Sequence, residues 1–277
     1  MTLDLVSKEL SQGTFEKISK VVYDVAGIYL PETKIGLVKS RLLKRLRILN
    51  LDSFEEYLEF VMSEKPAKEL EQMIDIITTN KTNFFREIQH FDFMRNVVLP
   101  AVLQNNDPIR MWSAGCSSGA EPYTIAMVLR ENITDIMKRD VKILATDISY
   151  EMLEIAKRGQ YSEAIKDEIS EKYLHKYFTR GVEEGKTLYT ARNELKQLVK
   201  YAYLNLMSDW PMRGPFQIIF CRNVMIYFDK ETRQKLINRF YSLLAPNGYL
   251  FVGHSESLTS TEHSFTYIQP AVYQKRI

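Results

Sequence analysis

The stretch that decides the fold is Ile109-Arg-Met-Trp-Ser-Ala-Gly-Cys-Ser-Ser-Gly-Ala-Glu-Pro122. A short apolar run ends in a loop of small residues, and apolar side chains at helical spacing follow it. The stretch therefore predicts a strand, a tight turn and a helix. Gly115 and Gly119 allow a sharp turn and the close approach of a ligand to the backbone. Pro122 suits the first turn of a helix, where its missing N–H is not needed.

Glu121 and the number of glycines distinguish this loop from loops that bind a dinucleotide. Those loops carry three glycines in the pattern G-x-G-x-x-G, whereas only Gly115 and Gly119 stand here. A carboxylate at the mouth of the helix repels pyrophosphate and favours a positively charged or zwitterionic ligand. On the loop alone, an ordinary strand–helix turn without a ligand is equally compatible.

Asp147, at the end of the next predicted strand, narrows the choice of ligand. Residues 141–147 predict a strand, and Ser149 is a good cap for the helix after it. An acid at this place in a βαβ unit can hydrogen-bond ribose hydroxyls, although a turn or capping role is the alternative. A nucleoside without a phosphate clamp, beside a cationic centre, describes S-adenosylmethionine.

The composition argues against several classes of protein. The chain has 277 residues, enough for one large domain or two, and a net charge of +2 that argues against nucleic-acid binding. Cys116 and Cys221 form no disulfide framework, and the start lacks a secretory signal, so we expect free thiols in a cytoplasmic protein. The apolar runs are far too short for membrane insertion, and no Cys/His spacing indicates a metal.

Residues 1–80 predict an all-helical domain. Apolar side chains recur at helical spacing from residue 14 to about 77, with a capping box at Ser53-Phe-Glu-Glu56. One flank of the second helix is basic, with no acid among its residues: Lys34, Arg41, Lys44, Arg45 and Arg47. Charge runs are usually solvated faces. Because this one is one-sided in a nearly neutral chain, we hypothesise that it docks an acidic protein surface.

Residues 81–108 predict a linker and a connecting helix that ends near Pro100, and residues 109–277 predict an α/β domain. The apolar run 216–221 is typical of a central parallel strand buried on both faces. Ligands bind beyond the carboxyl ends of such strands, so the residues that follow are expected near the site. These are Arg222, Asn223 and Tyr227.

An insertion at about 160–200 interrupts the alternation of strands and helices. Within and after it, residues 187–190 and 198–204 predict strands of a small antiparallel element around a turn at 181–185. Inserted lobes of this kind often serve partner or substrate recognition. A further turn is predicted at 245–248, before the last strands.

Five motifs carry a resemblance to a known family. They are Thr79-Asn-Lys-Thr-Asn-Phe-Phe-Arg-Glu87, Ala114-Gly-Cys-Ser-Ser-Gly-Ala-Glu-Pro122, Ala145-Thr-Asp-Ile148, Phe220-Cys-Arg-Asn-Val-Met-Ile-Tyr-Phe228 and Gly253-His-Ser-Glu256. Together they make nearly the whole chain resemble the bacterial chemotaxis receptor methyltransferases, the CheR family.

The resemblance implies an enzyme that transfers methyl from S-adenosylmethionine to glutamate side chains in the cytoplasmic domains of chemoreceptors, with S-adenosylhomocysteine as product. It implies an all-helical N-terminal domain followed by a Rossmann-like α/β methyltransferase domain with a small antiparallel β insertion. In some members that lobe docks a peptide at the receptor's C-terminus. The family's cofactor-binding positions correspond to Asn80, Thr82, Arg86, Glu121, Asp147, Asn205, Leu206, Arg222 and Asn223, and the glycine loop adds Gly115.

Two residues are predicted to act on the methyl acceptor. A glutamate carboxylate is ionised at neutral pH, with a free pKa of about 4.3, so it needs positioning rather than a general base. Arg86 is expected to orient it by bidentate hydrogen bonds, and Tyr227 to contact it or the methyl donor, with a core aromatic role as the alternative for Tyr227. His254 is expected to be structural, and Cys116 a packed small residue.

Two other functions remain open at this point. One is a methyltransferase with a different substrate; the DNA amino-methylating enzymes carry a proline pair where this chain has Arg222-Asn-Val-Met, so nucleic acid is not the expected partner. The other is a non-catalytic module that binds S-adenosylmethionine and regulates a partner through the basic helix.

Overall fold

The computed structural model describes residues 8–63, 67–104 and 107–276. The first residues, on which the expectation about a secretory signal rests, lie outside this part. The chain divides into two compact units, the first ending at Thr79 and including Tyr227–Asp229, the second containing the remainder from Asn80 on. Across the described ranges, no helix combines the length and the apolar character that crossing a bilayer requires.

The first unit is helical. Its elements are α1 (Gln12–Ala26), the 3-10 turn η1 (Glu32–Lys34), α2 (Ile35–Leu49), α3 (Phe54–Met62) and α4 (Ala67–Ile77). Ser11 and Ser53 cap α1 and α3, because each hydroxyl accepts the backbone N–H three residues later. An antiparallel bridge between Ile28 and Phe228 attaches the segment Tyr227–Asp229 to this unit. The all-helical prediction for this part is confirmed.

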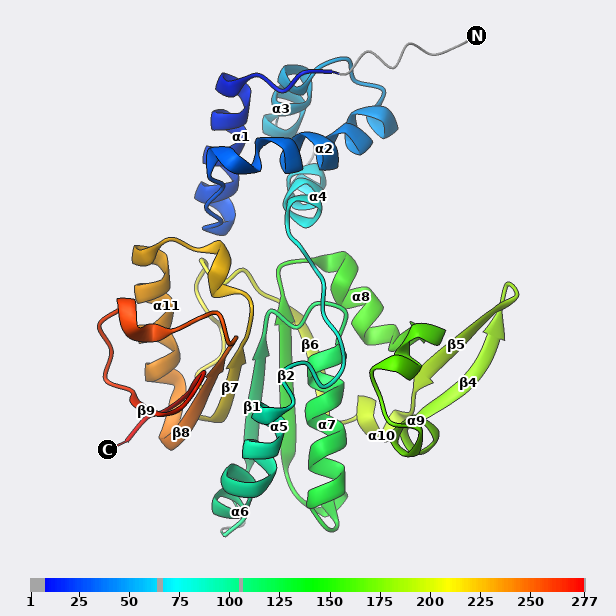
Figure 1. The fold of residues 1–277 in the computed structure, drawn as a ribbon, viewed down its shortest axis with the longest axis vertical. Helices are drawn as coiled ribbons and strands as arrows, with labels where there is room; N and C mark the ends of the chain where they lie inside the picture. The colour runs from blue at the N-terminus through cyan, green and yellow to red at the C-terminus, as the bar shows by residue number, and fades with distance from the viewer. Residues whose placement is uncertain (1–7, 64–66, 105–106, 277) are drawn as a thin grey trace. The chain divides into compact units, whose positions relative to one another are not determined.

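The second unit is built on a seven-stranded sheet in the order β6-β2-β1-β7-β8-β10-β9 (Figure 1). The strands are β1 (Ile109–Ala114), β2 (Val141–Asp147), β6 (Val199–Tyr203), β7 (Phe216–Cys221), β8 (Leu244–Val252), β9 (Thr266–Gln269) and β10 (Val272–Gln274). The strands from β6 to β8 run parallel, and β10 runs antiparallel to both of its neighbours. This is the predicted Rossmann-like order, in which the chain leaves β1 in one direction and returns on its other side at β7.

Three longer helices flank the sheet: α7 (Ala120–Asn132), α8 (Tyr150–Arg158) and α11 (Lys230–Leu243). The strand, turn and helix predicted from residues 109–122 are confirmed as β1 and α7. Ser149 caps α8 as predicted, since its hydroxyl accepts the Met152 N–H at 3.1 Å. Met111, Ile143 and Ile218 on adjacent strands are fully buried, which explains the near-continuous apolar runs of the central strands.

The helical stretch before the sheet ends at Val102, near Pro100 as predicted. It comprises α5 (Gln89–Phe93), the π turn η2 (Met94–Val98) and α6 (Leu99–Val102). The Leu99 N–H bonds to the Met94 carbonyl, so the missing N–H of Pro100 falls in the first turn of a new α segment, where no partner is needed. Phe91, Met94 and Val98 are buried in the core of the second unit.

The insertion forms a separate antiparallel sheet in the order β3-β5-β4. The prediction of a small antiparallel element in the insertion is therefore confirmed. The elements of the insertion are β3 (Gln160–Ser162), η4 (Glu163–Asp167), α9 (Glu171–Tyr177), β4 (Phe178–Glu183), β5 (Lys186–Ala191) and α10 (Asn193–Lys196). The assignment of residues 198–204 to this sheet was wrong. Val199–Tyr203 pairs in parallel with β2 at the edge of the main sheet, and β4 is the hairpin partner of β5.

The turn expected at 245–248 was also wrong. These residues lie within β8, whose register against β7 shifts between Phe216 and Ile218. Asn247 adopts φ of 59° there, so the turn-forming sequence makes an irregularity in the strand instead of ending it.

Candidate functional site

The glycine loop lies at the point where the sheet order reverses, between the carboxyl ends of β1 and β7. The N–H groups of Gly115 and Cys116 both donate to the Thr146 carbonyl, which ties the loop to the end of β2. Gly115 has φ of 81°, and a Cβ there would lie 2.3 Å from the Val224 side chain. This glycine therefore serves both the turn and the close packing of the loop against the segment after β7.

Asp147 fixes the other side of the same loop. Its carboxylate accepts the Ser117 N–H at 2.7 Å and the Ser149 N–H at 2.9 Å, each on a different oxygen. Burial raises the pKa of Asp147, while these backbone bonds favour the ionised form. Each oxygen retains acceptor capacity, so the residue fits a role as acceptor for ribose hydroxyls.

Arg222 lies at the centre of a buried ionic cluster, with 2% of its side chain exposed. Its guanidinium donates to Glu121 at 3.1 Å, to Glu87 at 3.1 and 3.3 Å, and to the Arg86 carbonyl. Glu121 also accepts the Ser113 hydroxyl at 2.6 Å. Burial raises the pKa of Glu121, although the Arg222 charge opposes this. Arg222 and Glu121, both predicted to bind cofactor, thus bind each other directly.

The segment 80–87 is attached to the glycine loop and to the inserted lobe. The Ser117 hydroxyl donates to the Asn80 carbonyl at 2.8 Å, and the Phe84 N–H donates to Glu168 at 2.8 Å. Phe85 and Glu87, on either side of Arg86, have φ of 52° and 54°. Left-handed backbone at non-glycine residues costs about 1–3 kcal/mol each and persists where surrounding contacts enforce it. The contacts therefore fix the backbone that carries Arg86.

Of the remaining predicted positions, Asn205 and Leu206 lie on the loop after β6 and Asn223 on the loop after β7, whereas Thr82 lies in the segment 80–87. The Leu204 N–H donates to the Asp147 carbonyl, and Asn205 accepts the Met207 N–H at 2.9 Å. Leu206 is buried, and Thr82 and Asn223 are half-buried. All of the predicted cofactor positions belong to the second unit. Tyr227 belongs to the first unit, where its hydroxyl donates to the Thr79 carbonyl at 3.3 Å.

Some of the cations predicted for the basic flank of α2 are bonded within the first unit and are not free to bind a partner. Arg41 donates to the carbonyls of Ile76, Ile77 and Thr78 at the end of α4, and Arg45 forms a bidentate pair with Glu69. The exposed cations of the predicted set are Lys34, Lys44 and Arg47.

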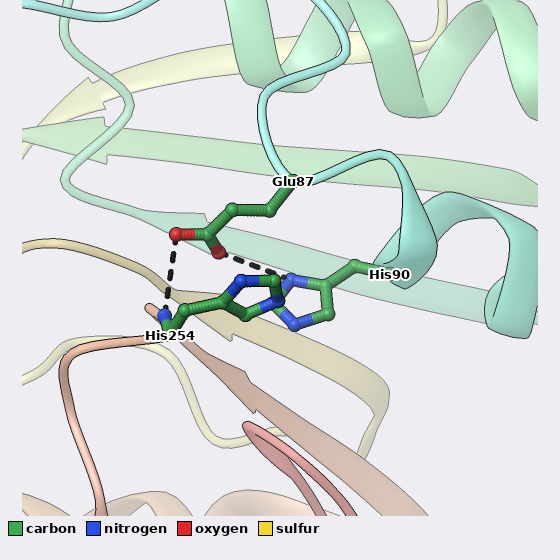
Figure 2. A group of neighbouring side chains, drawn as sticks. All are labelled: Glu87, His90 and His254. Carbon is green, nitrogen blue, oxygen red and sulfur yellow. Dashed lines mark hydrogen bonds and ion pairs between the residues drawn. The ribbon is translucent and has the colours of Figure 1, made fainter.

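Sequence reasoning assigned no role to Glu87 or Glu256, although both lie in the motifs that carry the resemblance. Glu87 forms a small group with His90 and His254, whose possible ligand atoms all lie within 4.8 Å of one another (Figure 2). Its carboxylate accepts the His254 N–H at 3.2 Å and lies 3.5 Å from Nδ1 of the buried His90 ring.

Electrostatics disfavours a metal ion in this group. Arg222 is already paired with Glu87. Burial works to raise the pKa of Glu87, but the Arg222 charge together with hydrogen bonds from the His254 backbone N–H and the Arg222 side chain holds that pKa below its ordinary value. Burial, reinforced by Arg222, lowers the pKa of His90 to about 3. A dication would lie beside the guanidinium, so we assign the group a structural role in joining the start of α5 to the loop after β8.

Comparison with known proteins matches both units of the chain. Residues 13–78 match the CheR methyltransferase, all-alpha domain, and residues 80–273 match the CheR methyltransferase, SAM binding domain. The chain is 41% identical over 258 residues to a probable chemotaxis protein methyltransferase of Rhizobium etli, covering 92% of this chain and 96% of that protein. It is 40% identical over 265 residues to the chemotaxis protein methyltransferase of Escherichia coli, covering 95% and 91%. The protein is thus a member of the CheR methyltransferase family, and its cofactor is S-adenosylmethionine.

Proposed function

We propose that this protein methylates glutamate carboxylates in the cytoplasmic domains of chemoreceptors, forming glutamyl methyl esters during chemotactic adaptation. The observation that carries the proposal is the family match over both units, together with two carboxylates, Glu121 and Asp147, at the carboxyl edge of the sheet. A ribose acceptor and an acidic helix mouth suit the nucleoside and the positive charge of S-adenosylmethionine.

The chain's residues divide the work of binding and orientation. When bound, S-adenosylmethionine supplies an electrophilic methyl group on a sulfonium centre. Asp147 would hold the ribose side of that site. Glu121, which is paired with Arg222 and Ser113, would face the charged side with its remaining acceptor capacity, and Asn80 and Asn223 would present polar groups from the two flanking loops. Because a substrate glutamate is already ionised near neutral pH, no residue needs to remove a proton from it. His90, with a pKa of about 3, is a poor base in any case.

We assign orientation of the acceptor carboxylate to Arg86, and keep the positioning role of Tyr227 as a separate proposal that rests on the sequence alone. A guanidinium can hold a carboxylate through two parallel hydrogen bonds, and correct orientation contributes about 7–11 kcal/mol in favourable cases. Too many cations around the carboxylate would reduce its nucleophilicity. Arg222 does not act as a further cation on the acceptor carboxylate, because its charge is already paired with Glu87 and Glu121 and its side chain is buried.

We assign receptor docking to three exposed cations: Lys34, at the end of η1, and Lys44 and Arg47 on α2. Chemoreceptor glutamates would give the acceptor surface a negative charge that these residues complement.

The test is methyl transfer from labelled S-adenosylmethionine to a chemoreceptor cytoplasmic fragment, with label released as methanol in mild base. We expect base-labile label on the receptor, and none on a matched fragment whose acceptor glutamates are replaced by alanine. Base-stable label would indicate a different substrate atom. No label on any fragment, with S-adenosylmethionine still bound, would favour the regulatory-module function instead.

A further inference from the structure

Glu256 joins the loop after β8 to the loop after β7 through a single buried carboxylate. One of its oxygens accepts the Asn223 N–H at 2.7 Å and the Gly253 N–H at 2.6 Å. The other accepts the Ile226 N–H at 3.1 Å. The residue is 5% exposed, so these bonds are shielded from water. One carboxylate therefore satisfies two backbone donors of the segment that directly follows Arg222.

The segment needs this support because of its backbone conformation. Asn223 has φ of 59°, in the left-handed region that residues other than glycine rarely adopt. Two of the three bonds made by Glu256 go to the start and the end of the segment 223–226. Without an acceptor at this place, the Asn223 and Ile226 N–H groups would lose their partner and the local fold would relax.

Gly253 shows how tightly the two loops are packed. A Cβ at this position would lie 2.6 Å from Nδ2 of Asn223 and 2.8 Å from the carboxylate of Glu256. The side-chain amide of Asn223 is thus held between its own loop and the end of β8. A change at either residue 253 or residue 256 would be transmitted to the Asn223 side chain.

We propose that Glu256 is a positioning residue for the cofactor site: by accepting the Asn223 and Ile226 N–H groups, it fixes the segment after β7 in the shape that binds S-adenosylmethionine. Burial raises the pKa of Glu256, while hydrogen bonds from the backbone of Gly253, Asn223, Ile226 and Met225 favour its ionised form. The proposal rests on cofactor binding and is independent of which substrate is methylated.

The test is Glu256→Gln in the full chain, with S-adenosylhomocysteine affinity measured by titration calorimetry. Glutamine has the same shape but turns an N–H₂ group toward backbone donors, so at least one of the three bonds is lost. We expect the Kd to rise about tenfold, the effect of losing one charge-assisted hydrogen bond. Amide hydrogen exchange across residues 223–226 should become faster in parallel.

The matched control is Glu69→Gln in the first unit. Glu69 is also 5% exposed and also accepts several hydrogen bonds, in its case from the side chains of Arg45 and Tyr57. It should lower the melting temperature and leave the Kd unchanged. Gly253→Ala, which keeps the carboxylate but presses on Asn223, should reproduce the affinity loss if Glu256→Gln fails to fold. Wild-type affinity in folded Glu256→Gln, or in folded Gly253→Ala, would overturn the proposal. Loss of label transfer to receptor alone would not bear on it.

Discussion

Arg222 donates two hydrogen bonds to the carboxylate of Glu87, a residue 135 positions earlier in the chain. A third bond reaches Glu121, so one guanidinium connects the segment before α5, the start of α7 and the end of β7. With 2% of its side chain exposed, Arg222 compensates two buried carboxylates that would otherwise repel each other. The predicted cofactor-binding residues Glu121 and Arg222 are therefore held by an ionic contact within the protein itself.

Replacing Arg222 with methionine should destabilise the second unit by about 3–5 kcal/mol, because it leaves buried carboxylates without a counter-charge. Urea unfolding followed by tryptophan fluorescence is a suitable measurement, since Trp112 and Trp210 both lie in this unit. As a control, Arg95→Met removes the exposed pair with Asp92 and should change stability by less than about 1 kcal/mol. Equal effects of the two substitutions would contradict the importance given to the cluster.

The second unit should lose stability in mild acid because of His90. The folded pKa of about 3 lies below the value near 6.5 expected in the unfolded chain, so between these values the unfolded chain binds the extra proton. This contribution is complete above about pH 6.5 and is lost as the pH falls toward 3. Between pH 7 and pH 5 the loss amounts to about 2 kcal/mol.

The same tryptophan-monitored unfolding, repeated at pH 7 and pH 5, tests this prediction. Other groups titrate in the range, so the informative quantity is the difference between the wild type and His90→Gln. The variant should lose less stability than the wild type on acidification. Identical pH profiles would show that His90 carries a proton in the fold, contrary to its burial among Glu87, Arg222 and His254.

Tyr227→Phe should lower kcat for receptor methylation about tenfold, or by about 1.4 kcal/mol in activation free energy, while leaving the Kd for S-adenosylhomocysteine within about twofold. The reason is that the hydroxyl is assigned to the acceptor rather than to cofactor binding. Tyr23→Phe, which removes a hydroxyl bonded to Asp229 in the same unit, should keep normal kcat. Full activity of Tyr227→Phe would remove this residue from the mechanism.

The sequence predicts the part of the fold in which local pattern and tertiary environment agree. The run ending at Ala114 and its glycine loop are strand and turn by composition, and they become the centre of the sheet. Val199–Tyr203 was misplaced because its alternating apolar residues suit an edge strand of either sheet. Its true partner is β2, with which it pairs in parallel, and the Leu204 N–H donates to the Asp147 carbonyl at the end of that pair. Local sequence patterns do not encode such long-range pairing.

The sequence predicts the site residues that the chemistry of the ligand requires. It does not predict the residues whose role is to bind and orient other residues of the protein. Asp147 and Glu121 follow from a strand end and a helix mouth. Glu87 and Glu256, in contrast, look like ordinary polar residues until folding brings them to Arg222 and to the Asn223 N–H. Long-range contacts of this kind leave no periodic signal, and only membership in a motif marked these residues.

The basic helix offers a prediction that separates docking from stability. Arg45 was expected on the docking surface, but it forms a bidentate pair with the buried Glu69, whose other contact is the Tyr57 hydroxyl. Arg45→Glu should therefore destabilise the first unit by about 3–5 kcal/mol, whatever its effect on partners. Its consequences for methylation could not be assigned to docking.

Lys44 and Arg47 are exposed, so their double reversal to glutamate should leave stability within about 0.5 kcal/mol. Binding to an acidic receptor fragment should weaken about tenfold or more, and its dependence on salt concentration should decrease, because two favourable charges become repulsive. The control is the double reversal of Lys17 and Lys20 to glutamate, which changes the net charge by the same amount at two exposed positions of α1 and should have a smaller effect. If the double reversal and the control weaken binding equally, net charge rather than this face of α2 attracts the receptor. If neither changes binding, the receptor docks elsewhere.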